Sequence, residues 1–552
     1  MNMNIDGIRA ARVEKGRRLR VDEARVVLRL PAPAAWCGPV LVALGLFFVL
    51  FGGADSDLRS ADARIGLAAS TAFSPMGQVF GNWTPDVWPL RAAVSRLFFF
   101  AEEPGRPQSG TVLWPSAVAG MAAGWLVARR LIQAGRFRTS LLFGFAWFGS
   151  AALLDHSNNA GLDLFAGLAT IAALDRLLAG ASDWWTGTWA AFAFLSAGWP
   201  PLLLLAVAIL VLGRREADFS FRLILPPAAA CLAWLAWTVK AGSVAVAAAA
   251  LAWPLTRQPA FTLGVEVALL ALPLSPFALL LLSPSLRRTV RENGTEMVFD
   301  WLQISAAAVV AGSIVPGLAV ICRTVALVGV LLAAASALEA AWSGSMQART
   351  RRWFLGAVLA VTAAWMLVAL YGGFIMTVAL PYYRPLGIVF AILSIGVFAL
   401  VWRAVETHDA RRSVAAMVLM TVCLKLIHWG YYTPEWNYRH GQGPWGRAIG
   451  QWLLPNWTLH TIHDWPEDLA WTIGNPVRQL HSPRHLAYPV SDESRYTLLL
   501  ESELENWPAS APKLMKVATF ADQDGRTRVL ARTAGVLYTH SGRVFRRVPP
   551  AE

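Results

Sequence analysis

Residues Gly53 to Leu90 read GADSDLRSADARIGLAASTAFSPMGQVFGNWTPDVWPL. They follow the first long apolar segment of the chain and carry three aspartates, Asp55, Asp57 and Asp62, within eight residues. Acidic side chains in a loop next to a membrane span either keep the loop in water or serve in a catalytic site, and these residues alone leave both interpretations open. The rest of the chain decides which side of a membrane this loop faces.

The composition is that of a membrane protein with many spans. Of the 552 residues, 56% are hydrophobic and only 15% are charged, whereas a soluble protein of this size would have about 25% charged residues. The 26 tryptophans fit interfacial belts. The net charge of +13 comes from basic clusters between apolar segments, which is typical of cytoplasmic loops beside anionic membrane lipids. We therefore reject nucleic acid as a partner. The four cysteines are isolated and form no disulfide or metal pattern.

About thirteen apolar segments are long enough to span a membrane, given about 20 residues per span. They lie near residues 36–52, 111–128, 141–154, 162–178, two within 186–212 that meet at Gly198-Trp199-Pro200-Pro201, 223–239, 263–282, two within 301–342 with a turn near Pro316 or Arg323, 354–374, 386–402 and 414–429. Every dense basic cluster between these segments falls on one side. The chain is therefore predicted to be a polytopic α-helical membrane protein with a cytoplasmic N-terminus.

This topology divides the chain into three parts. Residues 1–34 are predicted to be a basic cytoplasmic segment, residues 35–430 the transmembrane domain, and residues 431–552 a small α/β extracytoplasmic domain. The outer loop 53–110 includes a predicted interfacial helix near 90–100. In the last part, residues 496–500, 517–520 and 528–530 read as strands, and a hairpin is predicted around Ser541-Gly542.

Several polar groups are predicted on the outer face, where no nucleotide-binding or common hydrolase motif occurs. Their order resembles the type C glycosyltransferases, in the branch of the lipid A aminoarabinose transferases and protein O-mannosyltransferases. The resemblance covers roughly residues 36–430. It rests on Asp55-Ser56-Asp57 followed by Val87-Trp88-Pro89-Leu90, on Asp163 at the start of a span, on Trp199-Pro200-Pro201-Leu202, and on Leu380-Pro381-Tyr382-Tyr383-Arg384-Pro385-Leu386. Family lysines are replaced at two places, where Gly198-Trp199 and Ala379 stand.

The resemblance implies a polyprenyl-phosphate-linked sugar as the donor and an inverting transfer on the outer face. Asp57 or Asp55 would be the general base; the register does not separate them, and we favour Asp57 slightly. A carboxylate in this role contributes about 10²–10⁴ in rate. A guanidinium at the outer face would stabilise the phosphate leaving group. Candidate substrate-binding residues are Asp163, His156, Tyr383, Arg384 and Arg439. Each has a simpler structural interpretation, such as helix capping for Asp163 or snorkelling for Arg384.

The leading hypothesis is a glycosyltransferase of the bacterial inner membrane, with its C-terminal domain in the periplasm. Its acceptor would be a lipopolysaccharide, another envelope glycan or a protein, and a divalent metal could assist. One alternative within the class is an enzyme that modifies only carrier lipids. The alternative from another class is a non-catalytic transporter or flippase of lipid-linked sugars, which predicts charged residues along a path through the middle of the bilayer.

Overall fold

The computed structural model describes most of the helical part of the chain and the core of its C-terminal part. The described residues are 32–50, 90, 94, 109–154, 163–181, 183–212, 221–241, 248, 251–252, 261–292, 296–315, 317–440, 443–453, 457–462, 467–475, 477–480, 482–483, 486, 495–521, 527–533, 536–538 and 544–546. The aspartate loop, the predicted interfacial helix apart from Leu90 and Val94, and residues 155–162 with His156 lie outside this description.

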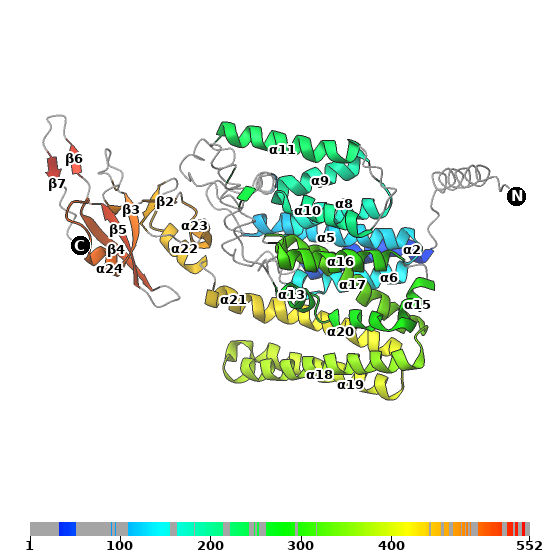
Figure 1. Cartoon of the computed structure of the whole chain (residues 1–552). Coiled ribbons are helices and arrows are strands. Elements are labelled where there is room, and N and C mark those ends of the chain that lie inside the picture. Colours follow the sequence, from blue (N-terminus) through cyan, green and yellow to red (C-terminus); the bar gives the residue numbers. More distant parts are fainter. Residues whose placement is uncertain are drawn as a thin grey trace.

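The larger part is a bundle of helices that run roughly along one direction (Figure 1). In chain order they are α2 (Ala32–Gly45) with η1 (Leu46–Leu50), α5 (Ser109–Gln133), α6 (Phe137–Phe148), α7 (Ala151–Leu154), α8 (Leu164–Leu178), α9 (Trp184–Ala197), α10 (Pro200–Leu212), α11 (Phe221–Ala241), α13 (Leu263–Leu270), α14 (Ser275–Ala278), η6 (Leu279–Leu282), α15 (Pro284–Glu292), α16 (Glu296–Ile314), α17 (Ala319–Ser343), α18 (Ala348–Val378), η7 (Pro381–Tyr383), α19 (Arg384–Glu406), α20 (Ala410–Ile427), η8 (His428–Tyr432) and α21 (Thr433–His440).

The helix α17 forms the centre of the bundle, and α18 and α19 form its edge. In α17, 78% of the most apolar stretch is buried, against 28% in α18 and in α19. The helices packed against α17 include α6, α8, α16 and α20. The exposed faces of α18 and α19 carry large apolar side chains such as Leu367, Phe374 and Ile392. Side chains of this kind on an outward face are expected where lipid replaces protein as the neighbour.

Among the described residues, five helices are long and apolar enough to cross a membrane: α16, α17, α18, the stretch Pro381–Glu406 and the stretch Ala410–Arg439. A sixth is added if the bent pair α13 and α14–η6 is counted as one span. Shorter apolar helices accompany them, at Trp36–Val49, Pro200–Leu212 and Phe221–Ala236. The protein is thus a polytopic helical membrane protein, and the count of thirteen spans stays a prediction.

The helix breaks follow the prolines and glycines of the sequence. The predicted break at 198–201 is confirmed, because α9 ends at Ala197, Gly198 has a φ of +78°, and α10 begins at Pro200. The predicted turn near Pro316 separates α16 from α17, and the alternative position, Arg323, lies inside α17. Residues 263–282, predicted as one span, form a bent pair of helices. The chain bends there by 112° between Leu270 and Ser275, around Pro273, which has no backbone N–H to continue the helix.

The last predicted span continues beyond the membrane part without a break. α20, η8 and α21 follow one another from Ala410 to His440, and α21 projects from the bundle towards the C-terminal domain (Figure 1). η8 (His428–Tyr432) is a short π-helix, whose turn is wider than that of an α-helix. Such π-helical turns are frequent at functional sites. The predicted domain boundary at residue 431 falls within this helix.

The C-terminal part contains α22 (Gly443–Gly450), α23 (Glu467–Ile473), α24 (Glu501–Glu505) and a five-stranded sheet with the order β2-β1-β3-β5-β4. The strands are β1 (Leu459–Thr461), β2 (Val477–Gln479), β3 (Tyr496–Leu500), β4 (Leu514–Ala521) and β5 (Thr527–Thr533), and β6 (Val536–Tyr538) pairs with β7 (Val544–Arg546) as a separate hairpin. The predicted strands at 496–500, 517–520 and 528–530 and the last hairpin are confirmed. The two parallel strands β1 and β2 were missed, because three residues carry too little pattern.

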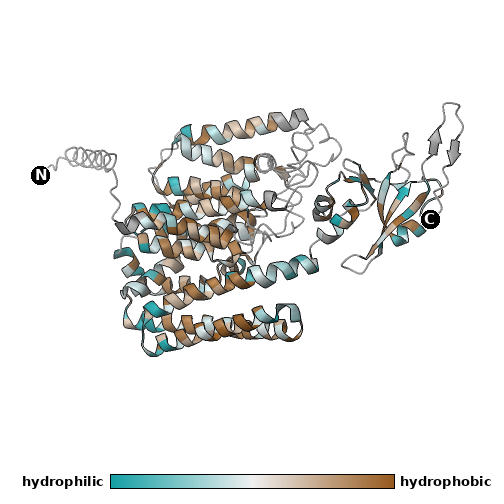
Figure 2. Cartoon of the chain, turned by 180° about the vertical axis from the view of Figure 1, so that it is seen from behind, coloured by the Kyte–Doolittle hydropathy of each residue, from teal (hydrophilic) through white to brown (hydrophobic). Residues whose placement is uncertain are grey.

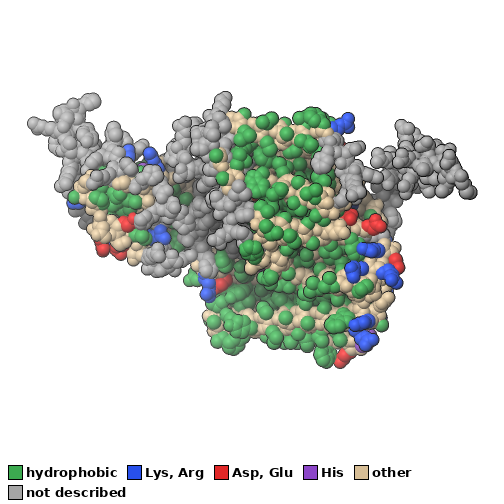
Figure 3. All heavy atoms as spheres, in the orientation of Figure 1, with side chains coloured by type: hydrophobic (Ala, Val, Ile, Leu, Met, Phe, Trp, Pro, Cys, Tyr) green, Lys and Arg blue, Asp and Glu red, His purple; other side chains and the backbone are tan. Residues whose placement is uncertain are grey.

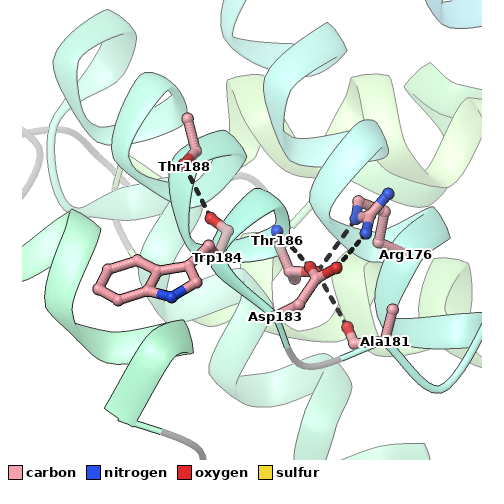
Figure 4. Close-up of polar contacts among 6 residues, drawn as sticks. All are labelled: Arg176, Ala181, Asp183, Trp184, Thr186 and Thr188. Atoms are coloured by element: carbon pink, nitrogen blue, oxygen red, sulfur yellow. Dashed lines mark hydrogen bonds and ion pairs between the residues drawn. The ribbon is translucent and has the colours of Figure 1, made fainter.

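The two ends of the bundle differ in charge. Lys and Arg side chains gather at the end of the bundle opposite to α21 (Figure 1 and Figure 3), and the hydropathy of the helices rises away from it (Figure 2). We call this the basic end, and we call the opposite end, from which α21 leads to the C-terminal domain, the domain end. At the basic end, Asp183 caps α9 by accepting from the Thr186 N–H at 3.0 Å and pairs with Arg176 (Figure 4). Arg130 pairs with Asp175 there at 2.8 Å.

Candidate functional site at the domain end

The two loops that carry the predicted base and His156 leave the described bundle at neighbouring points. The loop with Asp55 and Asp57 follows η1, and the loop with His156 follows α7. η1 and α7 are in contact, and Leu153 of α7 lies under Gly120 of α5. Asp55, Asp57 and His156 themselves lie outside the described residues, so their roles stay predictions.

Asp163 lies at the domain end of α8 and is 9% exposed. Its carboxylate accepts a hydrogen bond from the Ala166 N–H at 2.9 Å, which makes it the N-cap of the helix. A carboxylate here also interacts favourably with the positive end of the helix dipole. The capping function is therefore established in the structure, and a role in substrate binding remains a proposal.

An ion pair lies close to Asp163 on the neighbouring helix. Arg323 of α17 donates to Glu266 of α13 through Nε at 2.6 Å, and its Nη2 lies 2.5 Å from the same carboxylate oxygen. Thr262 donates to the other oxygen at 2.6 Å. α17 passes next to α8, since a β-carbon on Gly167 would lie 2.5 Å from the Thr324 methyl. In the sequence, Glu266 falls inside a predicted span and Arg323 near a predicted span end, and nothing there joins the two.

A second polar cluster forms where the α18–α19 turn meets the last helix. The Tyr383 ring packs edge-on against Tyr431, with ring centroids 5.1 Å apart. Glu435 lies close enough to the Tyr383 hydroxyl to interact with it electrostatically, and Glu435 accepts from Arg439 Nε at 2.5 Å. Two predicted substrate-binding residues, Tyr383 and Arg439, are thus brought together by a carboxylate that the sequence analysis missed. The i, i+4 spacing of Glu435 and Arg439 was the signal that could have found it.

Arg384 does not join this cluster in the structure. Its Nε donates to the Thr377 carbonyl at 3.2 Å, back along α18. The neighbouring Tyr382 is 89% exposed, and other aromatic side chains are exposed at the same end, among them Tyr371 and Tyr438. The opposite end of the bundle also carries exposed aromatic side chains, which are Trp342, Trp353 and Trp402. Two such rows fit the aromatic belts at the two faces of a membrane.

Lys425 is the functional candidate that sequence reasoning missed altogether. It lies in α20 and is 1% exposed, among the largest fully buried side chains of the chain. A charged side chain inside a span is rare and costly, and such residues tend to serve a function. The signal was available in the sequence, as a lone lysine within the apolar run 413–427.

No group of three or more His, Cys, Asp or Glu side chains that could hold a metal ion occurs among the described residues. The part of the chain that is described therefore supplies carboxylates, guanidinium groups, tyrosines and one buried ammonium. These groups can bind an anion and position a sugar.

No model of a known protein family matches the sequence, and no curated protein matches it. Two solved structures match the fold, both crystal structures of ArnT from Cupriavidus metallidurans, at 14% sequence identity. The one bound to undecaprenyl phosphate has a TM-score of 0.66 and covers 90% of this chain and 98% of that chain. The apo structure has a TM-score of 0.60 and covers 91% and 98%. The chain has the fold of ArnT.

The resemblance to the aminoarabinose transferase branch of the type C glycosyltransferases is thereby confirmed at the level of the fold. The matches cover about nine-tenths of the length of this chain. A match of this kind shows the architecture, and the chemistry must be argued from the residues.

Proposed function

We propose that this protein is an integral-membrane glycosyltransferase that uses a polyprenyl-phosphate-linked sugar as its donor. The observation that carries the proposal is the ArnT-like fold over about 90% of the chain, one of the two matched structures being bound to undecaprenyl phosphate. The clustering of polar groups at the domain end supports it, because a lipid donor presents its phosphate and sugar at a membrane face while its tail stays in the bilayer.

The proposed reaction is a single inverting displacement. The acceptor hydroxyl oxygen attacks the anomeric carbon of the sugar as the bond between that carbon and the phosphate oxygen breaks. The electron pair of the broken bond goes to the phosphate, which leaves as polyprenyl phosphate. Asp57 or Asp55 takes the acceptor proton, and a general base of this kind contributes about 10²–10⁴ in rate. Cationic groups at the domain end stabilise the charge that develops on the leaving phosphate.

Within this proposal the Tyr383–Glu435–Arg439 cluster contacts the donor or the acceptor. Glu435 has 14% of its side chain exposed and Arg439 has 57%, so the carboxylate is held inside the cluster while the guanidinium faces outward. An exposed guanidinium with a fixed orientation can bind a carboxylate or a phosphate with two parallel hydrogen bonds. Asp163, His156 and Arg384 keep their proposed binding roles, and the membrane orientation, with the domain end outside, follows the charge rule.

The deciding experiment measures sugar transfer by the full-length protein in lipid nanodiscs. The donors are undecaprenyl phosphate carrying aminoarabinose, glucose or mannose, offered one at a time, and the acceptors are lipopolysaccharide and an envelope protein extract. Free undecaprenyl phosphate and glycosylated acceptor should appear in equal amounts. If all donors stay intact with every acceptor, while ArnT prepared in the same way transfers aminoarabinose, the proposed function is wrong.

One observation favours the alternative of a non-catalytic flippase. Lys425 is a buried charge inside a span, which is what a path through the bilayer predicts. The two functions differ in product, because a flippase moves the intact lipid-linked sugar and releases no free carrier. Measuring both movement of the donor between leaflets and release of undecaprenyl phosphate in proteoliposomes separates them.

A further inference from the structure

Lys425 is a buried cation without a counter-ion in the described part of the chain. Its side chain is 1% exposed, and no carboxylate or other acceptor is paired with its ammonium group there. A buried charge without a partner costs several kcal/mol by general estimates. Three guanidinium groups among the described residues of the domain end differ from it, since each already has an acceptor: Arg323 has Glu266, Arg439 has Glu435 and Arg384 has the Thr377 carbonyl.

The position of Lys425 along α20 places it in the outer half of the membrane. It lies about 22 Å along the helix from Ala410, at about 1.5 Å per residue, and the hydrocarbon core of a bilayer is about 30 Å thick. α8 is 15 residues long, so Asp163 lies at a similar height of about 22 Å above the basic end. Lys425 and the start of α8 therefore lie at comparable depth, below the Tyr383–Glu435–Arg439 cluster.

Lys425 continues the face of α20 that turns towards the α6–α7 corner. Thr421, one turn earlier on the same face, packs against Gly149 at the end of α6 so closely that a β-carbon there would overlap its methyl group. The Ala151 N–H of this corner donates to the Leu272 carbonyl at the bend between α13 and α14. Residues three to four apart share a helix face. Lys425 therefore lies on the side of α20 that faces the α6–α7 corner.

We propose that Lys425 forms an intramembrane anion site for the phosphate of the lipid carrier. The inference rests on the proposed function and adds the residue that would hold the phosphate. At this depth an anion whose hydrophobic tail remains in the bilayer can bind the ammonium when the side chains that bury Lys425 move aside, whereas a water-soluble sugar phosphate would also have to be dehydrated. The bound phosphate supplies the missing counter-charge, which stabilises a lysine that is otherwise costly to bury.

The test compares lipid binding by the full-length wild type with that of Lys425→Met and Lys425→Arg in nanodiscs, measured by native mass spectrometry. The probes are undecaprenyl phosphate, the uncharged undecaprenol and phosphatidylglycerol. Lys516→Met is the matched control, because it removes one exposed lysine, paired with Glu501 at 3.0 Å in the C-terminal domain. We expect Lys425→Met to weaken undecaprenyl phosphate binding at least tenfold, Lys425→Arg to retain most of it, and undecaprenol binding to be the same in all variants.

Thermal unfolding of the ligand-free variants gives a second readout. Methionine fills a similar volume without a charge, so we expect Lys425→Met to be as stable as the wild type or more stable. Undecaprenyl phosphate should raise the melting temperature of the wild type and of Lys425→Arg, but not that of Lys425→Met. A lysine that merely held an ion pair would show the reverse, a loss of stability in Lys425→Met without ligand.

The outcomes separate this inference from the proposed function. If the wild type binds undecaprenyl phosphate and transfers sugar, and Lys425→Met binds the lipid equally well, the Lys425 site is wrong and the function stands. If phosphatidylglycerol competes equally and depends equally on Lys425, the residue holds membrane phospholipid and the carrier assignment is overturned. If the wild type neither binds undecaprenyl phosphate nor transfers sugar, the proposed function fails first.

Discussion

The two ends of the helical bundle hold charged residues in different ways. At the basic end, acids and guanidinium groups pair with one another next to helix ends, as Arg130 does with Asp175 and Arg176 with Asp183. Asp183 also caps α9, and the Thr186 hydroxyl lies 3.0 Å from its carboxylate. Arg176 and Asp183 pair within the α8–α9 loop (Figure 4), and Arg130 of α5 pairs with Asp175 of α8. Each of these charges has a partner of opposite charge at a helix end, so their arrangement calls for no ligand.

At the domain end charged groups also connect elements that are distant in the sequence, and one of them is unpaired. Glu266 and Arg323 join α13 to α17, Glu435 of α21 lies close to Tyr383 of the α18–α19 turn, and Lys425 has no acid partner in the described residues. Polar groups that converge from several elements on one face are the usual form of a binding site. The comparison therefore assigns structure to the basic end and function to the domain end, and each prediction below tests that assignment.

The largest effect is expected from the predicted base. Changing Asp55 and Asp57 together to asparagine should lower the rate of sugar transfer by about 10²–10⁴, because the acceptor proton then has no general base. Asp62→Asn is the matched control in the same loop and should transfer normally. Initial rates with the active donor measure the effect, and the two single variants identify which aspartate is the base. Full activity in the double variant would remove the base from this loop.

A smaller effect is expected from the Glu435–Arg439 pair. Glu435→Gln leaves the guanidinium without its ionic partner and loosens Tyr383, so we expect transfer to fall about tenfold, a change of about 1.4 kcal/mol in transition-state free energy. The matched control is Glu501→Gln, which breaks the exposed pair with Lys516 in the C-terminal domain. Separate measurement of kcat and KM shows whether the cluster acts in binding or in the chemical step. Equal activity in both variants would make the cluster structural.

The third prediction compares two N-cap aspartates at opposite ends of the bundle, Asp163 of α8 at the domain end and Asp183 of α9 at the basic end. Each substitution by alanine should cost about 1 kcal/mol of helix stability, since each removes a hydrogen bond to a backbone N–H near the helix start. Only Asp163→Ala should also lower transfer, by more than the loss of folded protein explains. Melting temperature and specific activity per folded molecule are the two measurements. If the two variants lose activity in the same proportion, Asp163 is only a cap.

Much of the architecture was predictable because membrane helices are long runs of apolar residues, which the sequence shows directly. The break at 198–201 followed from two prolines, and the strands around 496–500 and 528–530 followed from alternation in a short aromatic and β-branched run. The bend in the 263–282 segment was not predictable from hydropathy, since the residues on both sides of Pro273 are equally apolar. Hydropathy measures how apolar a segment is. The directions of the α13 and α14 axes depend instead on packing against α16 and α17.

The site was less predictable than the fold, because its parts are joined only in three dimensions. Tyr383 was singled out from a motif, but its partner Glu435 lies 52 positions further along the chain, and nothing in the sequence relates the two. Lys425 was overlooked because a single lysine barely lowers the hydropathy of a span. Its burial makes Lys425 a functional candidate, because the same residue at a lipid-facing or terminal position would snorkel to the interface.

The smallest expected effect is the pH dependence of the stability of the start of α9, which Asp183 caps at the basic end. Burial alone would raise the pKa of Asp183, but the hydrogen bonds from the Thr186 N–H, Arg176 and the Thr186 hydroxyl outweigh it and hold the pKa below its usual value. Because the folded pKa is depressed, the stabilisation is fully present above the unfolded carboxyl pKa of about 3.9. It is lost as the pH falls through the folded pKa. The side chain is 41% exposed, so solvent screening keeps the effect small.

Hydrogen exchange at the first turn of α9, corrected for the intrinsic exchange rate, should therefore rise when the pH falls below about 4, where an ordinary carboxylate becomes protonated. Asp183→Asn should show faster exchange at neutral pH and no further rise in acid. Transfer by Asp183→Asn at neutral pH should equal that of the wild type, because the group it alters is far from the domain end. A loss of transfer in this variant as large as that of Glu435→Gln would mean that the two ends are coupled through α8 and α17, and the division of structure from function between them would no longer hold.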